Sequence, residues 1–413
     1  MQTISKEKRE EAVDYSLDAI KHICDDIGPR ESGTPNERKA QDWLKEELLN
    51  NKWADEAVID EFQVSRHGLV GFSKIVATFL LIAVLASMVG YFVVSAYVVL
   101  QIIALLFIIL SLAMFLFEFV LYKPFVDSFL PKSTSSNVYA KYHSIGETKK
   151  RIIFSGHCDS AYEWTLMKVS PTLMIAVLIG SLIGALLFVA LIIVSLVIGK
   201  IPMWSVAINI IFAPFYFGLY YMCNFKKVVP GANDNLTGVL ASMSVLKCLK
   251  ETDIRFENTE VAVLLTGSEE AGLRGARAWA RKYKDEIKTS SIDTVFISLE
   301  TFRDWDHFCI YSRDMTMTVG HDKGVINLLK KATIKAGRPL KTALVPFGAS
   351  DGAAVTKEGL RACCVAGMDP KPANYYHNMK DTADNMDRKS LAFGVDIAIE
   401  SAFIFNEEGA PEN

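Results

Sequence analysis

Long apolar stretches alternate with polar segments along the chain. Between residues 75 and 122 the only charged side chain is Glu118, and a second apolar stretch covers residues 169–225 with one break at Gly199-Lys200-Ile201-Pro202. A helix needs about 20 apolar residues to cross a bilayer, so each stretch is long enough for two helices and a turn. Globular core helices rarely stay apolar on every side over such lengths. The pattern therefore predicts four transmembrane helices in two hairpins, with the first turn near residues 91–101.

The polar segments have the pattern of one interrupted α/β domain. Short β-branched and aromatic runs predict strands at residues 57–62, 136–142, 151–154, 261–265, 294–299 and 362–366. Periodic apolar positions predict helices at residues 40–48, 236–249 and 324–336. This alternation implies a mostly parallel or mixed central sheet with helices on both faces, and it places the first hairpin between neighbouring strands. We expect residues 1–73, 123–168 and 226–413 to form this domain, and residues 74–122 and 169–225 to form the hairpins.

Two shorter patterns refine these elements. Thr34-Pro35-Asn36-Glu37 has the sequence of a capping box with proline at the first helical position. Gly180 and Gly184 form a small-xxx-small pair, which favours close packing among the four spans, with helix dimerisation as the alternative.

The charges around the hairpins predict the orientation in the membrane. Two hairpins return the chain each time to the side it left, so the polar segments share one side. That side carries the flanking charges Arg66, Lys74, Lys123, Lys132, Lys168, Lys226 and Lys227, whereas the far loops offer only Lys200. The positive-inside rule then places the polar domain in the cytoplasm. We expect a multi-pass integral protein of the cell membrane with lipid as its surroundings.

Composition agrees with this assignment. Hydrophobic residues make up 51% of the 413 residues, which is too apolar for a purely soluble protein. The 44 basic and 47 acidic residues nearly balance, which argues against a nucleic-acid binder. The seven cysteines are odd in number and scattered, which favours a reducing compartment over a disulfide framework. No cleavable signal peptide is apparent in the first thirty residues.

Histidines and carboxylates follow the apolar runs in five clusters. They are His157 with Asp159, Asp234, Glu269 with Glu270, Glu300, and His377. Ligand sites in open parallel sheets form beyond the carboxyl ends of the strands, where three of these clusters lie. Zinc takes histidine nitrogen and carboxylate oxygen, and a two-metal hydrolase needs a shared carboxylate and a free base. Five ligands are available here, and Glu269 remains as a base.

The order of these clusters resembles the zinc exopeptidases of clan MH, peptidase family 28, which include aminopeptidases and glutamate carboxypeptidases. The matching segments are Gly156-His157-Cys158-Asp159, Gly231-Ala232-Asn233-Asp234-Asn235, Glu269-Glu270-Ala271-Gly272-Leu273-Arg274-Gly275, Ser298-Leu299-Glu300, and His377-Asn378-Met379-Lys380-Asp381-Thr382. The resemblance covers nearly all of the polar chain and excludes the membrane hairpins. Gly348-Ala349-Ser350-Asp351 matches more loosely a family segment near the substrate pocket.

The resemblance implies a role for each residue. One zinc ion would be held by His157, Asp234 and Glu300, and the second by Asp234, Glu270 and His377, so that two zinc ions share Asp234. Glu269 would be the general base, and Asp159 would orient His157 from behind. The family usually has aspartate where this chain has Glu300, so we expect a displaced or weaker metal on that side. Since the second hairpin lies between His157 and Asp234, we expect the site to face the bilayer surface.

Three functions stay open at this point. The first is a membrane-anchored metallopeptidase, most simply an aminopeptidase acting on peptides. The others are a single-zinc acyltransferase resembling glutaminyl cyclase and a non-catalytic scaffold. Carboxypeptidase specificity would need a cation in the site, for which Arg303, Arg313 and Arg361 are undecided candidates. Asp304, Asp306 and His307 are expected to form a polar loop, and a homo-oligomer is possible.

Overall fold

The computed structural model describes residues 3–371 and 374–411. Two compact units make up the chain, and each is built from separate stretches of sequence. The first unit combines Met1–Arg66, Pro131–Ala161 and Val228–Asn413, and the second combines His67–Leu130 and Tyr162–Lys227.

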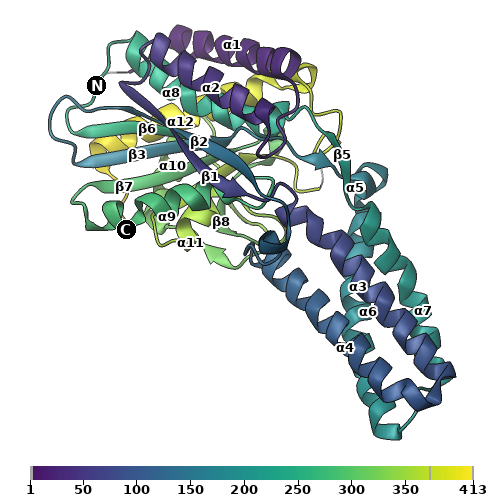
Figure 1. The fold of residues 1–413 in the computed structure, drawn as a ribbon. Helices are drawn as coiled ribbons and strands as arrows, with labels where there is room; N and C mark the ends of the chain where they lie inside the picture. The colour runs from purple at the N-terminus through teal and green to yellow at the C-terminus, as the bar shows by residue number, and fades with distance from the viewer. Residues whose placement is uncertain (1–2, 372–373, 412–413) are drawn as a thin grey trace. The chain divides into compact units, whose positions relative to one another are not determined.

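The first unit is built on a nine-stranded mixed sheet (Figure 1). Its strands are β1 Glu56–Val64, β2 Ser133–Tyr142, β3 Lys150–His157, β6 Thr259–Thr266, β7 Asp293–Glu300, β8 Phe308–Asp314, β9 Val319–Gly320, β10 Thr342–Leu344 and β11 Ala362–Gly367. The order is β1-β2-β6-β3-β7-β11-β8-β10, and β9 pairs with β8. The central strands β6, β3, β7 and β11 run parallel, whereas β1 and β2 are antiparallel to their neighbours, as is β8 to β11. The predicted mixed sheet is confirmed.

Helices cover both faces of this sheet, as its side-chain alternation requires. They are α1 Lys6–His22, α2 Pro35–Asn50, α8 Thr237–Glu251, α9 Arg274–Thr289, α10 Lys323–Lys335, α11 Asp351–Lys357 and α12 Arg388–Glu408. Val295 and Ile297 of β7 pack into the main core with α1, α8 and α12, whereas Phe296 points to the other face and meets Trp279 of α9. Figure 1 shows α9 and α11 on the face opposite α1 and α8. The central strands β3, β6, β7 and β11 are therefore buried on both sides, which is why they read as apolar runs.

Helix α2 begins where the sequence predicts, but its cap differs from the expected capping box. Thr34 is the N-cap and Pro35 the first helical residue, yet the Thr34 side chain makes no capping hydrogen bond. Glu37 Oε2 accepts the N–H of Gly33 at 2.7 Å instead of the N–H of Thr34. The capping-box prediction is wrong in this respect, because Glu37 is turned into the protein and is only 1% exposed.

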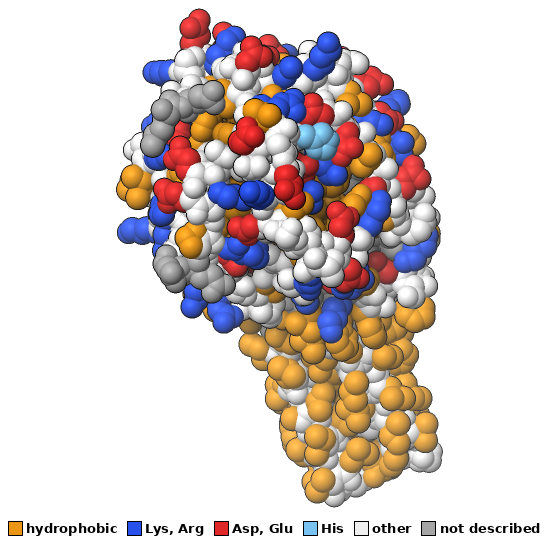
Figure 2. Space-filling model, turned by 90° about the vertical axis from the view of Figure 1, so that its left-hand side faces the viewer, with side chains coloured by type: hydrophobic (Ala, Val, Ile, Leu, Met, Phe, Trp, Pro, Cys, Tyr) orange, Lys and Arg blue, Asp and Glu red, His pale blue; other side chains and the backbone are white. Residues whose placement is uncertain are grey.

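The second unit contains the predicted apolar helices. They are α3 Gly68–Phe92, α4 Tyr97–Met114, α6 Pro171–Ile198 and α7 Met203–Gly218, with the short α5 Thr165–Val169 and a two-stranded sheet of β4 Tyr162–Glu163 and β5 Asn224–Val228. Four helical stretches of this unit are long and apolar enough to cross a membrane. The turns fall at residues 93–96 and 199–202, as predicted. Figure 2 shows apolar side chains covering the visible surface of this unit. The four helices are therefore candidate membrane spans.

Packing between α6 and α7 accounts for the small-xxx-small pair. A Cβ atom added at Gly180 would lie within 3.0 Å of the Phe215 ring, and one at Gly184 would lie as close to Phe212 and Tyr216. The two glycines thus let aromatic side chains of α7 approach α6 within one chain. The hairpin of α3 and α4 leaves the sheet after β1 and returns before β2, and these strands pair directly with each other. The prediction that this hairpin sits between neighbouring strands is confirmed.

Candidate metal centre

Three parallel strands deliver the first side chains of the site to one edge of the sheet. His157 is the last residue of β3, which lies between β6 and β7. Glu300 closes β7, and Glu269 follows the end of β6 by three residues. Gly156 allows α8 to reach this edge, because a Cβ atom there would lie within 3.0 Å of the backbone of Gly238 and Val239.

Asp234 lies between two histidines and faces one with each oxygen. Its Oδ1 is 3.2 Å from His157 Nε2, and its Oδ2 is 3.1 Å from His377 Nε2. Asp381 fixes the backbone of the Asp234 loop, since its carboxylate accepts the N–H groups of Asn233 at 2.8 Å and of Asp234 at 3.2 Å. The side chains at positions 157, 234 and 377 are thereby brought together from segments far apart in the sequence.

The three predicted glutamates complete two groups around this aspartate. Glu270 Oε1 lies 3.2 Å from His377 Nε2, and Glu300 Oε2 lies 3.9 Å from His157 Nε2. Glu269 Oε2 is also 3.9 Å from His157 Nε2. All six residues therefore line one cavity of about 80 Å³.

Asp159 lies behind this arrangement and is fully buried. Its backbone oxygen is 3.2 Å from His157 Nδ1, and its carboxylate Oδ1 is 3.5 Å from the same atom. The carboxylate accepts the N–H groups of Glu269 at 2.9 Å and Glu270 at 3.0 Å, and the hydroxyl of Ser32 at 2.8 Å. The backbone oxygen of Asp159 thus contacts the His157 ring, while its carboxylate accepts hydrogen bonds from Glu269, Glu270 and Ser32.

The electrostatics of the cavity reflect a surplus of buried carboxylates. Burial raises the pKa of Glu269 well above its usual value, against the opposing effect of His157. Burial also raises the pKa of Glu300, to about 8. Burial alone would lower the pKa of His377, but Glu270 and Asp234 raise it to about 9. The two imidazoles outweigh the burial of Asp234 and hold its pKa well below its usual range. A cation would balance this charge.

The donor set fits a metal ion. Asp234 Oδ2 and Glu270 Oε1 are buried and accept no hydrogen bond from the described residues, which leaves both oxygens available for coordination. Donor atoms of His157, Asp234 and Glu270 lie within 4.8 Å of one another. Imidazole nitrogen with carboxylate oxygen is a donor set that zinc takes in catalytic sites.

Several residues that support the site were not predicted from sequence. Glu300 is held by Ser298, which donates to Oε1 at 2.8 Å, and by Asn235, which donates to Oε2 at 2.7 Å. Arg30 is fully buried and donates to the carbonyl oxygens of Cys158 at 2.7 Å and Gly231 at 2.8 Å, which ties together the loops of His157 and Asp234.

The undecided residues lie outside the cavity. Arg361 pairs with Asp293 and Asp322, Arg303 with Asp304 and Asn385, and Arg313 donates to the Met317 carbonyl. Asp306 and His307 lie in a short 3₁₀ turn, Trp305–His307, as the polar-loop interpretation expects. Among the described residues that line the cavity there is no lysine or arginine.

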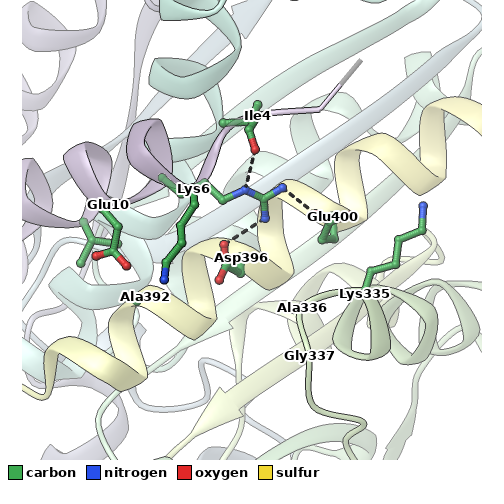
Figure 3. Close-up of a pocket in the computed structure, with 11 residues that line it drawn as sticks. Ile4, Lys6, Glu10, Lys335, Ala336, Gly337, Ala392, Asp396 and Glu400 are labelled. Carbon is green, nitrogen blue, oxygen red and sulfur yellow. Dashed lines mark hydrogen bonds and ion pairs between the residues drawn. The ribbon is translucent and has the colours of Figure 1, made fainter. Parts of the chain in front are cut away.

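A second hollow of about 400 Å³ lies among α1, α10 and α12 (Figure 3). Arg9 spans it, donating to Asp396 at 2.9 Å, to Glu400 at 2.6 Å and to the Ile4 carbonyl at 3.3 Å. No histidine lines it among the residues that the structure describes. Its central charges are already paired, so it does not compete with the carboxylate and histidine cavity as a metal site.

Comparison with known proteins finds a family model that matches the later part of the chain. The sequence model of peptidase family M28 matches residues 218–401, a stretch that contains Asp234, Glu269, Glu270, Glu300 and His377. No sequence among the curated proteins matches the chain.

Solved structures share the fold at low sequence identity. An aminopeptidase from Aneurinibacillus sp. strain AM-1 is 13% identical, covers 97% of this chain and 96% of its own, and superposes with a TM-score of 0.57. A glutaminyl cyclase from Fimbriiglobus ruber is 14% identical, covers 95% of both chains and gives a TM-score of 0.55. BSAP, a zinc aminopeptidase from Bacillus subtilis, is 13% identical, covers 95% of this chain and 94% of its own, and gives a TM-score of 0.54.

Proposed function

The chain is an M28-family peptidase-fold protein, and from this premise we propose that it hydrolyses peptide bonds as a membrane-anchored zinc aminopeptidase. The observation that carries the proposal is the position of Asp234, whose two oxygens face two different histidines at 3.2 and 3.1 Å. A carboxylate between two imidazoles could be shared by two metal ions, each with its own histidine, as in a two-metal hydrolase.

The residues divide into two ligand groups and a base. His157, Asp234 and Glu300 would hold one zinc ion, and Asp234, Glu270 and His377 would hold the other. Zinc, when bound, supplies Lewis-acid polarisation of a carbonyl and activation of a water molecule. Glu269 is the remaining carboxylate of the cavity, and it accepts the proton of the attacking water and passes it to the leaving amine. Asp159 holds the backbone of the base in place through the N–H of Glu269 at 2.9 Å.

The walls of the cavity favour an aminopeptidase over a carboxypeptidase. A carboxypeptidase must bind the terminal carboxylate of its substrate, and no cationic side chain of the described residues lines the cavity. The surplus of carboxylates suits the positively charged amino terminus of a peptide. Much of the remaining wall is apolar or aromatic, with Tyr311, Val345, Phe347, Ala366 and Met368, although Thr301 and Ser350 also line it. We therefore propose peptides with a free amino terminus and an uncharged first residue as substrates.

A glutaminyl cyclase is the second candidate. Both oxygens of Glu300 accept hydrogen bonds from the protein, and its Oε2 lies farther from His157 than Asp234 does. A weaker ligand on this side would leave one zinc ion per chain. Zinc content and the release of ammonia from glutaminyl peptides distinguish this activity from hydrolysis, and a protein that binds no zinc would be a scaffold.

The deciding experiment uses the full chain in nanodiscs, loaded with zinc and tested on aminoacyl reporter substrates. Glu269→Gln is expected to keep two zinc ions and to lose turnover by a factor of about 10² or more, because only the base is lost. Glu147→Gln is the matched control, since Glu147 is exposed and lies outside the cavity. Unchanged hydrolysis in the Glu269 variant would rule out the assigned mechanism.

A further inference from the structure

Glu37 of helix α2 is a fully buried carboxylate that pairs with no cation among the described residues. It is 1% exposed, and its partners are all neutral donors. Burying an unpaired charge is costly unless hydrogen bonds compensate for the lost water. Helix capping alone therefore does not explain why a carboxylate is buried at position 37.

The hydrogen bonds of Glu37 join three segments that are distant in sequence. Oε2 accepts the N–H of Gly33 at 2.7 Å and the hydroxyl of Ser135 on β2 at 2.8 Å. Oε1 accepts the N–H of Ser268 at 2.8 Å, with the Ser268 hydroxyl at 3.4 Å. The carboxylate thus reaches the residue directly before the base Glu269.

Ser268 is the first of three successive N–H groups that are bound by carboxylates. Glu37 takes the N–H of Ser268, and Asp159 takes those of Glu269 and Glu270 through its two oxygens. Ser268 has a φ of 54°, a left-handed conformation that is uncommon for residues other than glycine. Two buried carboxylates therefore determine the backbone from which the base and a predicted ligand project.

The N-terminal segment also packs tightly against this backbone. Ser32 donates to Asp159 at 2.8 Å. Residues 32–37 therefore supply one of the two carboxylates that bind the loop, Glu37, and also contact the other, Asp159. A Cβ atom at Gly267 would lie within 3.0 Å of Glu37 Oε1 and of Gln41 on the next turn of α2. The loop before Glu269 thus packs closely against α2, with no space for a side chain at position 267.

We propose that Glu37 is a positioning residue for the catalytic base, which sets the conformation of residues 268–270 through the N–H of Ser268. This inference rests on the proposed function for its catalytic meaning. Only a carboxylate satisfies the donors, because an ionised carboxylate accepts at both oxygens, whereas an amide would turn an NH₂ group toward N–H or O–H donors. A displacement of about 1 Å at a reacting group can cost about 100-fold in rate, so a small change of this loop is felt in turnover.

The test compares Glu37→Gln with Ser135→Ala in zinc-loaded full-length protein. Glu37→Gln is expected to lower kcat by about 10- to 100-fold with KM within about twofold, similar to the loss found for outer-shell partners of metal ligands. Ser135→Ala removes one donor from the far oxygen and leaves the Ser268 contact, so its kcat is expected within about twofold of wild type. A Glu37→Gln variant with wild-type kcat and only a lower melting temperature would overturn the proposal.

A second readout does not depend on activity. Hydrogen–deuterium exchange of the metal-free protein should show the amides of residues 268–270 exchanging about tenfold faster or more in Glu37→Gln, with the rest of the first unit unchanged. If wild type hydrolyses nothing, the proposed function fails, and this exchange pattern still decides the role of Glu37. Uniformly faster exchange would overturn it.

Glu37→Asp serves if the glutamine variant does not fold. It keeps the charge but is one methylene shorter, so it cannot reach Ser268 and the Gly33–Ser135 side together. The same loss of kcat and the same local exchange are expected, and wild-type values of both would overturn the proposal.

Discussion

At the scale of single residues, Glu300 is the predicted zinc ligand that lies farthest from its histidine. Its Oε2 lies 3.9 Å from His157 Nε2, whereas the nearer Asp234 oxygen lies 3.2 Å away. Ser298 and Asn235 hold both of its oxygens. The longer side chain therefore still brings an oxygen toward His157, with two hydrogen bonds to keep it there.

Glu300→Gln is expected to weaken the binding of one of the two proposed zinc ions selectively. The variant loses the negative charge and one acceptor oxygen, so zinc affinity on the His157 side should fall by about tenfold or more. At limiting free zinc the content should drop from two ions to about one per chain, measured by elemental analysis of the purified protein. Glu269→Gln, which keeps every predicted ligand, is the control. Two tightly bound ions in the Glu300 variant would contradict its role as a ligand.

At the scale of elements, the strand ends and the start of α8 bring the ligands together. Gly156 precedes His157, and the backbone of α8 passes over it at a distance that excludes a side chain. The site therefore depends on close packing between β3 and α8 as well as on its ligands.

Gly156→Ala is expected to lower the melting temperature and the zinc content together. The added Cβ would meet backbone atoms of Gly238 and Val239, which cannot move aside as a side chain can. Overpacking of this kind typically costs about 1–3 kcal/mol of folding free energy. Gly320→Ala is the matched control, because a Cβ there meets nothing within 4 Å. Equal melting temperatures of the two variants would show that this contact adapts.

These elements also show which parts of the fold could be predicted from the sequence. Strands β3, β6 and β7 were predicted because they are buried on both faces and read as apolar runs, such as Ile152 to Phe154. Strand β8 was missed because Ser312, Arg313 and Asp314 break the apolar pattern in its second half. His157, Glu269, Glu270 and Glu300 were found because they follow such runs, and Asp234 because it follows a proline-glycine turn. His377 was found because it precedes Asp381-Thr382, as in the family pattern.

The supporting contacts could not be found in this way. Glu37 reaches Ser268 across 231 positions, and Arg30 reaches Gly231 across 201. Local sequence periodicity cannot predict hydrogen bonds between residues so far apart in the sequence. Glu37 therefore reads as a helix cap in the sequence, and only the folded chain turns it toward the base.

At the scale of the whole molecule, the order of the segments makes the orientation testable. Each apolar hairpin of the second unit starts and ends in the first unit's sequence, so we propose that the whole α/β unit lies on one side of the membrane that the candidate spans would cross. Basic residues are concentrated on the sequence flanks of the hairpins, and Lys200 is the only one in their turns. We propose that the α/β unit faces the cytoplasm.

Cysteine labelling of intact cells tests this orientation. Lys200→Cys places a thiol in the turn between α6 and α7, and Glu407→Cys places one at an exposed position near the end of α12. A membrane-impermeant maleimide should label position 200 from outside and should label position 407 only after the cells are opened. Wild type is the background control, since its seven free cysteines are buried or half-buried. Labelling of position 407 in intact cells, with position 200 protected, would place the α/β unit outside the cell. That result would also contradict the reducing compartment inferred from the seven cysteines.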